Sequence, residues 1–593
     1  MSLLTVFYVN HKEKKQCGVY QFGYHIGNAL QKSKKYKFIY LECDSVTELR
    51  QFINQHSPSL IIYNYHPWTM PWVTPEFTSS INIPQIGTIH EVTQTVADEM
   101  QVGHFDAYIA PDPTLILKNP IVYKTGRLVP KYINKKTFNS SDIVTIGSFG
   151  FGLQGKGFDK VINRVQDEFD EAIIRLHIPY SDFADPTGKG AQEIANYCKK
   201  LLRKPNITIE ITHNFLTTQE LLDFLASNTL NMFCYEEYKN RGISSVIDFA
   251  LAVNRPIALT KSLMFRHLGG CKPSIFIEDN SLKNIIQNGT DPIKKYVIDF
   301  SEENLIWEYE HIVSDNIHRT SVIYKASLFE RIIRRIKREI GLIPKYQKRQ
   351  ITVKQWLHNS NADIEFFPNI QYIEYCPVQN INSFNTILNN KKREQYEATI
   401  KLISELNPSV IKRKIPEANI QQAFVFDTVY RFLEKFNKPR ILCVGSFEDT
   451  ASLSLKKIGV DLDEIDPVIN YTLEKFIERP NRRFDKYDII FSTSVIEHVE
   501  DDVKFISDMS ELLAENGFII LTCDFKEDYK PGDPKPDVNY RFYTKNDLLY
   551  RLLPAAKDCI IFGEYQWDCP NPDFFMAGYN YTFATVVLQK TKN

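Results

Sequence analysis

The sequence predicts an α/β protein with three successive units of parallel sheet and helix. Short apolar runs of strand length alternate with helical stretches from the N-terminus to about residue 300, and the alternation begins again near residue 440. Within the first stretch the pattern restarts after Asn139, which divides it into two units of about 150 residues each, a usual domain size. A chain of 593 residues is too long for one core, so several domains are expected.

Composition and charge fit a globular protein that works in a reducing compartment. Hydrophobic residues make up 43% of the chain and charged residues 24%, and the net charge of −1 provides no basic field for nucleic acid. Ten cysteines are scattered without a C-x-x-C pair, which argues against disulfides and a zinc site. The N-terminus is typical of a strand rather than of a secretory signal, and no apolar run could span a membrane. We therefore expect a cytoplasmic protein.

The elements of residues 1–140 follow from short apolar runs separated by helical stretches. The predicted helices are YQFGYHIGNALQ and SVTELRQFINQ, and the predicted strands are LTVFYV, KFIYLE, SLIIYNY, PQIGTIH and DAYIAP. Strands that alternate with helices in this way form a parallel sheet.

The pattern repeats over 141–345 and, after a break, over 386–593. The strands expected in the second unit are IVTIGSF, AIIRLHIP, ITIEIT, LNMFCYE and RPIALT, followed by helices over 301–345. Residues 346–385 lose periodicity and are interpreted as a linker or packed connector. The strands expected in the third unit are RILCVG, VDLDEID, YDIIFST, GFIILTC after an Asn-Gly turn, CIIFGEY and YTFATVVLQ.

A glycine-rich turn in the second unit has the outline of a phosphate site. The strand VTIGSF runs into GFGLQGKGFDKVI, where glycines permit close backbone approach, a helix begins, and Lys156 adds a positive charge. The motif differs from a Walker A loop because Gly157 follows the lysine. A plain surface turn remains an alternative at this point.

A second stretch, CYEEYKNRGISSVIDFALAV, is predicted to form a strand, a polar turn and a helix. Ser244 and Ser245 are expected to cap that helix, beside Gly242, and Arg241 lies at its mouth. Glu236 and Glu237 precede the turn, where a carboxylate could hold sugar hydroxyls.

Together these stretches resemble the C-terminal half of a family-4-like glycosyltransferase of the GT-B fold. CGVYQFGYHIGNAL and PQIGTIHE resemble the first glycine loop and the histidine-ending strand of the N-terminal half. The resemblance covers about 1–345, the second unit being the donor-binding domain, and implies a nucleotide-sugar donor. It places the donor's diphosphate on Lys156, Arg241, Gly242, Ser244 and Ser245, with Gly18 and His90 near the transferred sugar and Glu237 among the catalytic candidates.

The sequence departs from that family at its acidic pair and its basic pair. Glu237 lies five residues before Gly242, the second acid position is filled by Asp248, and the arginine upstream of Lys156 is missing. No D-x-D motif occurs in 1–345, which argues against the metal-dependent GT-A class, so no metal is expected.

A single glycine, Gly445 in ILCVGSFEDT, ends the first strand of the third unit. Asp466 follows 21 residues later at the end of a second strand, where an acid can bind a ribose diol. The long stretch FDKYDIIFSTSVIEHVEDDVKFISDMSELLAENGFIILTCDF then closely resembles class I S-adenosylmethionine-dependent methyltransferases, over about 386–593.

This second resemblance implies an S-adenosylmethionine site. Gly445, Ser446 and Phe447 would lie at the methionine part, Asp466 would bind the ribose and Ser494 would line the floor. Because Cys443 stands where the family has an acid, we expect Glu448 or Asp449 to hold the methionine amino group.

Glu497 and His498 come where a strand hands over to a helix, facing the expected acceptor pocket. His498 could accept a hydroxyl proton, since its ordinary pKa is near neutral. Capping or packing of the helix is the alternative, and positioning of the acceptor alone could be enough for methyl transfer.

The chain is thus predicted to be a bifunctional enzyme that adds a sugar to a glycan or lipid-linked glycan and methylates a sugar hydroxyl, in surface polysaccharide synthesis. The basic stretch 331–350 either contacts an anionic membrane or packs as a crossover helix. Two alternatives stay open: a glycan-binding scaffold with one active unit, and methylation of a protein or small metabolite. The oligomeric state is not indicated.

Overall fold

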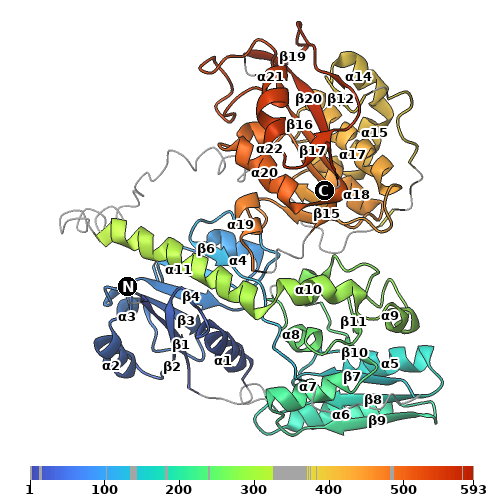
Figure 1. The fold of residues 1–593 in the computed structure, drawn as a ribbon. Helices are drawn as coiled ribbons and strands as arrows, with labels where there is room; N and C mark the ends of the chain where they lie inside the picture. The colour runs from blue at the N-terminus through green and yellow to red at the C-terminus, as the bar shows by residue number, and fades with distance from the viewer. Residues whose placement is uncertain are drawn as a thin grey trace. The chain divides into compact units, whose positions relative to one another are not determined.

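The structure is a computed structural model that describes residues 3–12, 17–101, 103–133, 143–180, 185–237, 241–324, 370–371, 373, 375–381, 383–480, 486–576 and 578–591. The chain forms two compact units, Met1–Gln347 and Lys348–Asn593 (Figure 1). The basic stretch 331–350 and residues 346–369 of the expected linker lie outside the described residues. An α/β fold with parallel sheets is confirmed.

The first sheet of the N-terminal unit has six parallel strands in the order β2-β1-β3-β4-β5-β6. Its strands are β1 (Thr5–Asn10), β2 (Lys37–Glu42), β3 (Leu60–Tyr65), β4 (Gln85–Ile89), β5 (Ala107–Ala110) and β6 (Val122–Lys124). The helices among them are α1 (Gly18–Leu30), α2 (Val46–His56), α3 (Pro75–Ser79) and α4 (Gln94–Glu99). Strand β1 is buried almost throughout, as apolar runs without alternation predict.

The second sheet has five parallel strands in the order β11-β10-β7-β8-β9. They are β7 (Thr145–Phe149), β8 (Ala172–His177), β9 (Ile207–Thr212), β10 (Leu230–Phe233) and β11 (Ile257–Leu259). The helices and 3-10 turns of this part are α5 (Phe158–Glu168), α6 (Lys189–Lys200), α7 (Thr218–Ala226), α8 (Val246–Leu251), η1 (Leu263–Leu268), α9 (Leu282–Asn288), η2 (Asp291–Ile293) and α10 (Lys294–Asp299).

Helix α11 (Glu302–Tyr324) follows the second sheet in sequence but packs on the first. Leu305, Tyr309 and Val313 are buried against residues of β1, β3, β4 and β5. Salt bridges add to this contact, because Glu302 at the start of the helix pairs with Lys32 and Lys131. A helix that crosses back to the first domain is what the GT-B resemblance implies.

The C-terminal unit is built on a seven-stranded sheet in the order β14-β13-β15-β16-β20-β17, with β19 also paired to β20. Its strands are β13 (Ile441–Val444), β14 (Asp463–Ile465), β15 (Tyr487–Thr493), β16 (Leu513–Phe525), β17 (Cys559–Ile561), β19 (Phe574–Met576) and β20 (Tyr579–Lys590). Strand β20 runs antiparallel to β16 and β17 and lies between them. A two-residue pair, β12 (Asn385–Thr386) with β18 (Tyr565–Gln566), lies outside this sheet.

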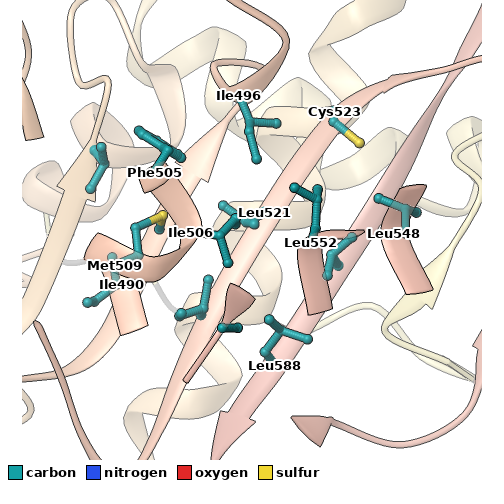
Figure 2. Packing of buried hydrophobic residues seen from close by; sticks show 14 of the residues in the cluster. Ile490, Ile496, Phe505, Ile506, Met509, Leu521, Cys523, Leu548, Leu552 and Leu588 are labelled. Carbon is teal, nitrogen blue, oxygen red and sulfur yellow. The ribbon is translucent and has the colours of Figure 1, made fainter. Parts of the chain in front are cut away.

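Helices cover both faces of the seven-stranded sheet. They are α14 (Asn390–Gln395), α15 (Glu397–Leu406), α16 (Pro408–Ile411), η3 (Pro416–Ala418), α17 (Asn419–Leu433), α18 (Thr450–Lys457), α19 (Leu473–Ile477), η5 (Ile496–His498), α20 (Asp502–Leu512), α21 (Lys545–Asp547), η6 (Leu548–Leu552) and α22 (Leu553–Ala555). Figure 2 shows apolar side chains of α20 and of 548–552 gathered about Leu521 of β16.

Two expected elements differ from the observed ones. The Asn-Gly pair at Asn516 lies within β16 rather than before it, because β16 begins at Leu513; the pairing with β15 is interrupted between Leu513 and Phe518, where Asn516 has φ of 60°. The run CIIFGEY is broken by Gly563, at φ 80°, into β17 and β18.

Candidate functional site

A cavity of about 730 Å³ in the N-terminal unit is lined by residues of both of its sheets. Its lining includes residues 17–22, 66–69, 89–92, 151–156 and 241–245. The residues predicted for the nucleotide sugar that line it are Gly18, His90, Lys156, Arg241, Gly242, Ser244 and Ser245. The fold therefore brings together residues as far apart in the sequence as Gly18 and Ser245.

Lys156 sits in a turn that only glycine can form. Gly155 and Gly157 have φ of 78° and 66°, and a Cβ on Gly157 would lie 1.8 Å from the carbonyl oxygen of Cys234. The Nζ of Lys156 lies 3.9 Å from the centre of the Tyr235 ring, a cation–π contact. The ring holds the ammonium group at the wall of the cavity while α5 begins at Phe158.

Arg241 forms an ion pair with Glu91, which follows His90 in the chain. The two loops meet closely, since a Cβ on Gly242 would lie 2.7 Å from the Cα of Glu91, and Glu91 itself has φ of 58°. Both charged side chains are about half exposed, at 52%, so solvent weakens their attraction. Arg241 is thus available to exchange this partner for an anionic ligand.

The helix after this loop begins later than expected. Helix α8 starts at Val246, and Ser245 takes the N-cap position without a side-chain cap hydrogen bond. The backbone N–H of Ser244 donates to Met264. The expected capping by Ser245 is therefore wrong, although both serines line the cavity.

Glu237 is not among the residues that line the cavity. Its carboxylate accepts a hydrogen bond of 2.9 Å from the backbone N–H of Leu263. The neighbouring Glu236 pairs with Lys160 at 3.5 Å. A role of Glu237 in catalysis stays a prediction.

Two buried ion pairs join the two sheets of the unit beside the cavity. Arg127 donates to both oxygens of Asp248, and Arg266 pairs with Asp112. All four side chains are at most 7% exposed, so each charge depends on its partner. Burial raises the pKa of Asp248 and the Arg127 charge opposes that rise. Asp248, which stands at the family's second acid position, is thus engaged within the protein.

His90 directly follows β4 and lines the cavity. Its Nε2 lies 2.9 Å from Oδ1 of Asn64, and the edge of its ring meets Phe22 with 5.2 Å between ring centres. Burial and the charges of His66, Arg127 and His11 lower the pKa of His90 to about 3. At neutral pH the ring is therefore uncharged and a weak proton acceptor.

In the C-terminal unit the predicted cofactor residues lie at the carboxyl ends of three adjacent parallel strands. Gly445 follows β13, Asp466 follows β14 and Ser494 follows β15. Ligands bind at this edge in open α/β sheets. The oxygens of Asp466 accept from the backbone N–H groups of Phe447 and Val468, at 3.2 and 2.7 Å, which holds the first loop to the second.

Several buried polar atoms around this edge have no hydrogen-bond partner. They are Ser446 Oγ, Asp449 Oδ2 and Thr493 Oγ1. Glu448, by contrast, forms an ion pair with Arg413 at 2.7 Å. Asp449, the other acid expected to hold an amino group, has one buried oxygen outside hydrogen-bond geometry, and burial raises its pKa. Unsatisfied buried polar atoms fit a site shaped for a polar, cationic ligand.

Glu497 and His498 occupy different environments. Glu497 is fully buried, accepts a 2.7 Å hydrogen bond from Ser494 Oγ, and has a second oxygen without a partner. Burial raises its pKa to about 7. His498 is exposed, with Nδ1 3.1 Å from the carbonyl oxygen of Val538. Asp524 at the end of β16 is buried too, and burial together with the charge of Glu497 raises its pKa.

Sequence reasoning missed Asn64, Glu91, Arg127 and Asp524, and it left the choice between Glu448 and Asp449 open. One signal was present for Asn64, a lone amide inside the apolar strand SLIIYNY. No local pattern marks Arg127, because its partner Asp248 lies 121 positions away.

Among the described residues, no cluster of three or more His, Cys, Asp or Glu side chains is arranged to hold a metal ion. In the same part of the chain, every helix is too short or too polar to cross a bilayer.

No protein-family model matches the sequence, and no curated protein is significantly similar to it. Among solved structures, Anabaena Alr3699/HepE in complex with UDP is similar with 12% identity over 53% of this chain and 100% of its own, at a TM-score of 0.37. The lipopolysaccharide outer core galactosyltransferase WaaB gives 9% identity, 53% and 99% coverage and a TM-score of 0.36. TehB from Haemophilus influenzae gives 17% identity over 28% of this chain and 62% of its own, at a TM-score of 0.20. Likenesses at these identities and TM-scores do not establish a function for this chain.

Proposed function

We propose that this protein is a bifunctional enzyme that transfers a sugar from a nucleotide-sugar donor to a glycan and methylates a sugar hydroxyl. The observation that carries the proposal is the shared cavity, where a lysine, an arginine, two serines, two glycines and a histidine meet from separate segments. A cavity of about 730 Å³ is of the size that holds a nucleotide-sugar-sized ligand.

In sugar transfer, negative charge grows on the leaving diphosphate. Lys156 and Arg241 supply positive charge at the cavity wall, and Ser244 and Ser245 add short polar side chains. For Arg241 to reach a phosphate it exchanges Glu91 for the ligand, a half-exposed pair that costs little to break.

Water must be kept from the donor during the reaction. The buried pairs of Arg127 with Asp248 and of Arg266 with Asp112 hold the two sheets together beside the cavity. Closure of the cleft on a bound donor would limit hydrolysis and strengthen the electrostatic interactions inside it.

The residues at the edge of the seven-stranded sheet fit S-adenosylmethionine on two observations. Asp449, Ser446 and Thr493 present buried polar atoms without partners, and Asp466 closes the loop that follows Gly445. When bound, this cofactor supplies an electrophilic methyl group. Asp449 would hold the amino group, Gly445, Ser446 and Phe447 would lie against the methionine part, and Asp466 would hold the ribose hydroxyls.

The methyl acceptor would lie beside Glu497. The Glu497 oxygen that has no hydrogen-bond partner can accept the proton of the acceptor's hydroxyl group, since a pKa near 7 suits a base at neutral pH. Joining the two activities in one chain raises the effective concentration of the glycosylated product at the second site. A methylated terminal hydroxyl would stop extension, which fits chain capping in surface polysaccharide synthesis.

Calorimetry of the full chain with UDP, GDP, ADP, dTDP and S-adenosylmethionine tests both halves of the proposal. We expect binding of one nucleoside diphosphate, reduced in Arg241→Ala, and binding of S-adenosylmethionine, reduced in Asp449→Asn. Each variant should leave the other ligand unaffected. Absence of heat with every diphosphate would overturn the glycosyltransferase half, and absence with S-adenosylmethionine the methyltransferase half.

One observation favours a second function, a glycan-binding unit without transfer activity. Asp248, at the position where the resemblance leads us to expect an acid for the donor, is held by Arg127. Mass spectrometry of products from nucleotide sugars, glycans and S-adenosylmethionine separates these functions. Methylation of a glycan to which no sugar has been added would support a glycan-binding N-terminal unit without transfer activity. Methylation of a protein or metabolite would show that the methyl acceptor is not a glycan.

A further inference from the structure

Trp68, in the turn that follows β3, is 76% exposed although it lines the cavity of the N-terminal unit. Tryptophan is highly buried on average in folded proteins, because its large apolar surface is unfavourable in water. An isolated apolar side chain on an open surface needs no explanation, but this one shares the cavity with the residues predicted for the nucleotide sugar. Its indole ring therefore offers an apolar face to a ligand in that cavity.

The turn that carries Trp68 is anchored in the protein. The carbonyl of His66 accepts from the backbone N–H groups of Thr69 and Met70, at 3.0 and 2.9 Å. Met70 is fully buried in the core on one face of the first sheet, and the ring of Pro67 fixes its own φ. The backbone under the indole ring is thus in place before a ligand arrives, which lowers the entropy that binding has to overcome.

His66 and Glu91 place polar groups near the indole ring. Tyr65 of β3 pairs with Ile89 of β4, so the loops after these strands leave the sheet side by side. The backbone N–H of Trp68 donates to Nδ1 of His66 at 3.2 Å, and the neutral ring therefore carries its hydrogen on Nε2. The negative charge of Glu91 acts on the same ring, where it opposes the lowering of the His66 pKa by burial. A hydrogen-bond donor and an acceptor thus accompany the apolar face.

The groups that fit a diphosphate come from the other sheet. Among the described residues that line the cavity, Lys156 and Arg241 are the lysine and arginine side chains outside a buried ion pair. Lys156 follows β7 and Arg241 precedes α8. The loops after β3 and β4 contribute the carboxylate of Glu91 instead. The wall that carries Trp68 is therefore suited to a neutral molecule rather than to a phosphate.

A sugar ring has the properties that this wall matches. The C–H groups of a pyranose gather on one face, and their partial positive charge favours the electron-rich face of an indole ring. The hydroxyl groups at its rim both donate and accept. Once Arg241 has exchanged Glu91 for the donor's phosphate, the released carboxylate can accept a hydrogen bond from one of these hydroxyls.

We infer that Trp68 is the platform on which the terminal sugar ring of the acceptor stacks, so that the acceptor presents a neutral sugar and not a phosphate at this wall. The inference rests on the proposed function of the cavity and specifies its second substrate. An aromatic face with a few polar groups around it binds a ring and orients it. A phosphate-bearing acceptor would instead meet the negative charge of Glu91.

Fluorine NMR of the full chain labelled with fluorotryptophan tests the contact directly. The signal of Trp68 is the one that is missing in Trp68→Phe. With the preferred nucleoside diphosphate present, the probes are the methyl glycosides of glucose, galactose, mannose and N-acetylglucosamine, and glucose 1-phosphate as the charged counterpart. We expect a saturable shift of the Trp68 signal with at least one methyl glycoside and none with glucose 1-phosphate. No shift with any methyl glycoside, or an equal shift with glucose 1-phosphate, would overturn the inference.

Substitutions separate stacking from a structural role. Calorimetry should show that Trp68→Ala weakens binding of that glycoside at least about tenfold, whereas Trp68→Phe keeps an aromatic face and most of the affinity. Affinity for the diphosphate should stay the same in both variants, because its binding groups lie on the other wall. The control is Tyr550→Ala, since Tyr550 is also 76% exposed but belongs to the C-terminal unit. Weaker diphosphate binding in Trp68→Ala would show that the ring stacks on the nucleotide base, which contradicts the inference.

The outcomes separate the inference from the proposed function. If a nucleoside diphosphate binds and no methyl glycoside shifts the Trp68 signal, the inference is wrong and the proposed function stands. If none of UDP, GDP, ADP and dTDP binds, the proposed function fails, and the inference fails with it. Should Trp68→Ala not fold, the signal of the labelled chain with its own tryptophan still decides the inference.

Discussion

Arg127 donates two hydrogen bonds to Asp248, of 3.1 and 2.6 Å, across the two sheets of the N-terminal unit. The side chains are 4% and 7% exposed, so neither charge has water to replace its partner. The pair links the segment after β6 to helix α8, and the cavity is lined by Arg127 itself and by Ser245, which immediately precedes α8.

Removal of one partner of this pair should destabilise the unit strongly. We expect Arg127→Met to lower the free energy of unfolding by about 3–5 kcal/mol, because it leaves the Asp248 carboxylate buried and unpaired. Urea unfolding followed by circular dichroism measures the change. The control is Lys294→Met, whose pair with Asp291 is exposed and should contribute less than about 1 kcal/mol. Equal effects of the two variants would show that the Arg127 pair is not a structural link.

Lys156 should contribute directly to diphosphate binding. Loss of a charged hydrogen bond costs about 1.5–3 kcal/mol, so Lys156→Met should weaken binding of the preferred nucleoside diphosphate about 10- to 100-fold. Calorimetry measures the dissociation constant. Lys160→Met is the matched control, since Lys160 lies on α5, pairs with Glu236 and is not among the cavity-lining residues. Binding that is unchanged in Lys156→Met contradicts the phosphate site.

Substitution of Asp449 should show whether its carboxylate binds a charged ligand or only caps a helix. It caps α18 through Ser452, at 2.6 Å, and asparagine caps helices equally well. Asp449→Asn should therefore fold normally and bind S-adenosylmethionine at least tenfold more weakly. Asp461→Asn, on the exposed surface nearby, should bind as the wild type does. Calorimetry with S-adenosylhomocysteine, which keeps the amino group, should show the same loss.

Glu497 makes the stability of the C-terminal unit depend on pH. Its pKa is about 7 in the folded protein against an ordinary value of 4.5, so between these values the folded state binds more protons than the unfolded state. Stability should therefore fall as pH rises from about 4.5 to about 7, by up to about 3 kcal/mol for this one group.

Melting curves of Glu497→Gln from pH 4.5 to 8 test that dependence. The variant should lose most of the decline and be more stable than the wild type at pH 8. Glu500→Gln, an exposed neighbour, should keep the wild-type profile. Because Asp524 is buried beside Glu497 with a raised pKa, Asp524→Asn should flatten the profile as well.

The strands could be read from the sequence because their signal is local. Runs such as KFIYLE and YDIIFST match β2 and β15 residue for residue. The start of β16 could not be predicted in this way. The Asn-Gly pair at Asn516 predicts that the strand begins after it, whereas β16 begins at Leu513 and its pairing with β15 resumes at Phe518.

The site was predictable in part for the same reason. Lys156 and Gly157 form a turn with a local pattern, whereas Glu91 and Arg241 become neighbours only through the approach of two loops 150 positions apart. The hydrogen bond of His90 is made with Asn64, from another strand, so it follows from the fold and not from the histidine's own sequence.

Strand β20 (Tyr579–Lys590) has a consequence for biosynthesis. It comes last in the sequence yet lies inside the sheet, between β16 and β17, and the N–H of Val587 donates to Asn385 near the start of the same unit. During synthesis on the ribosome, one edge of β16 therefore stays unpaired until residues 579–590 have emerged. Such an edge invites association with other chains. We expect nascent chains that end before residue 579 to need chaperones that shield the unpaired edge of β16. Residues 1–324, which are synthesised earlier, can already have folded by then.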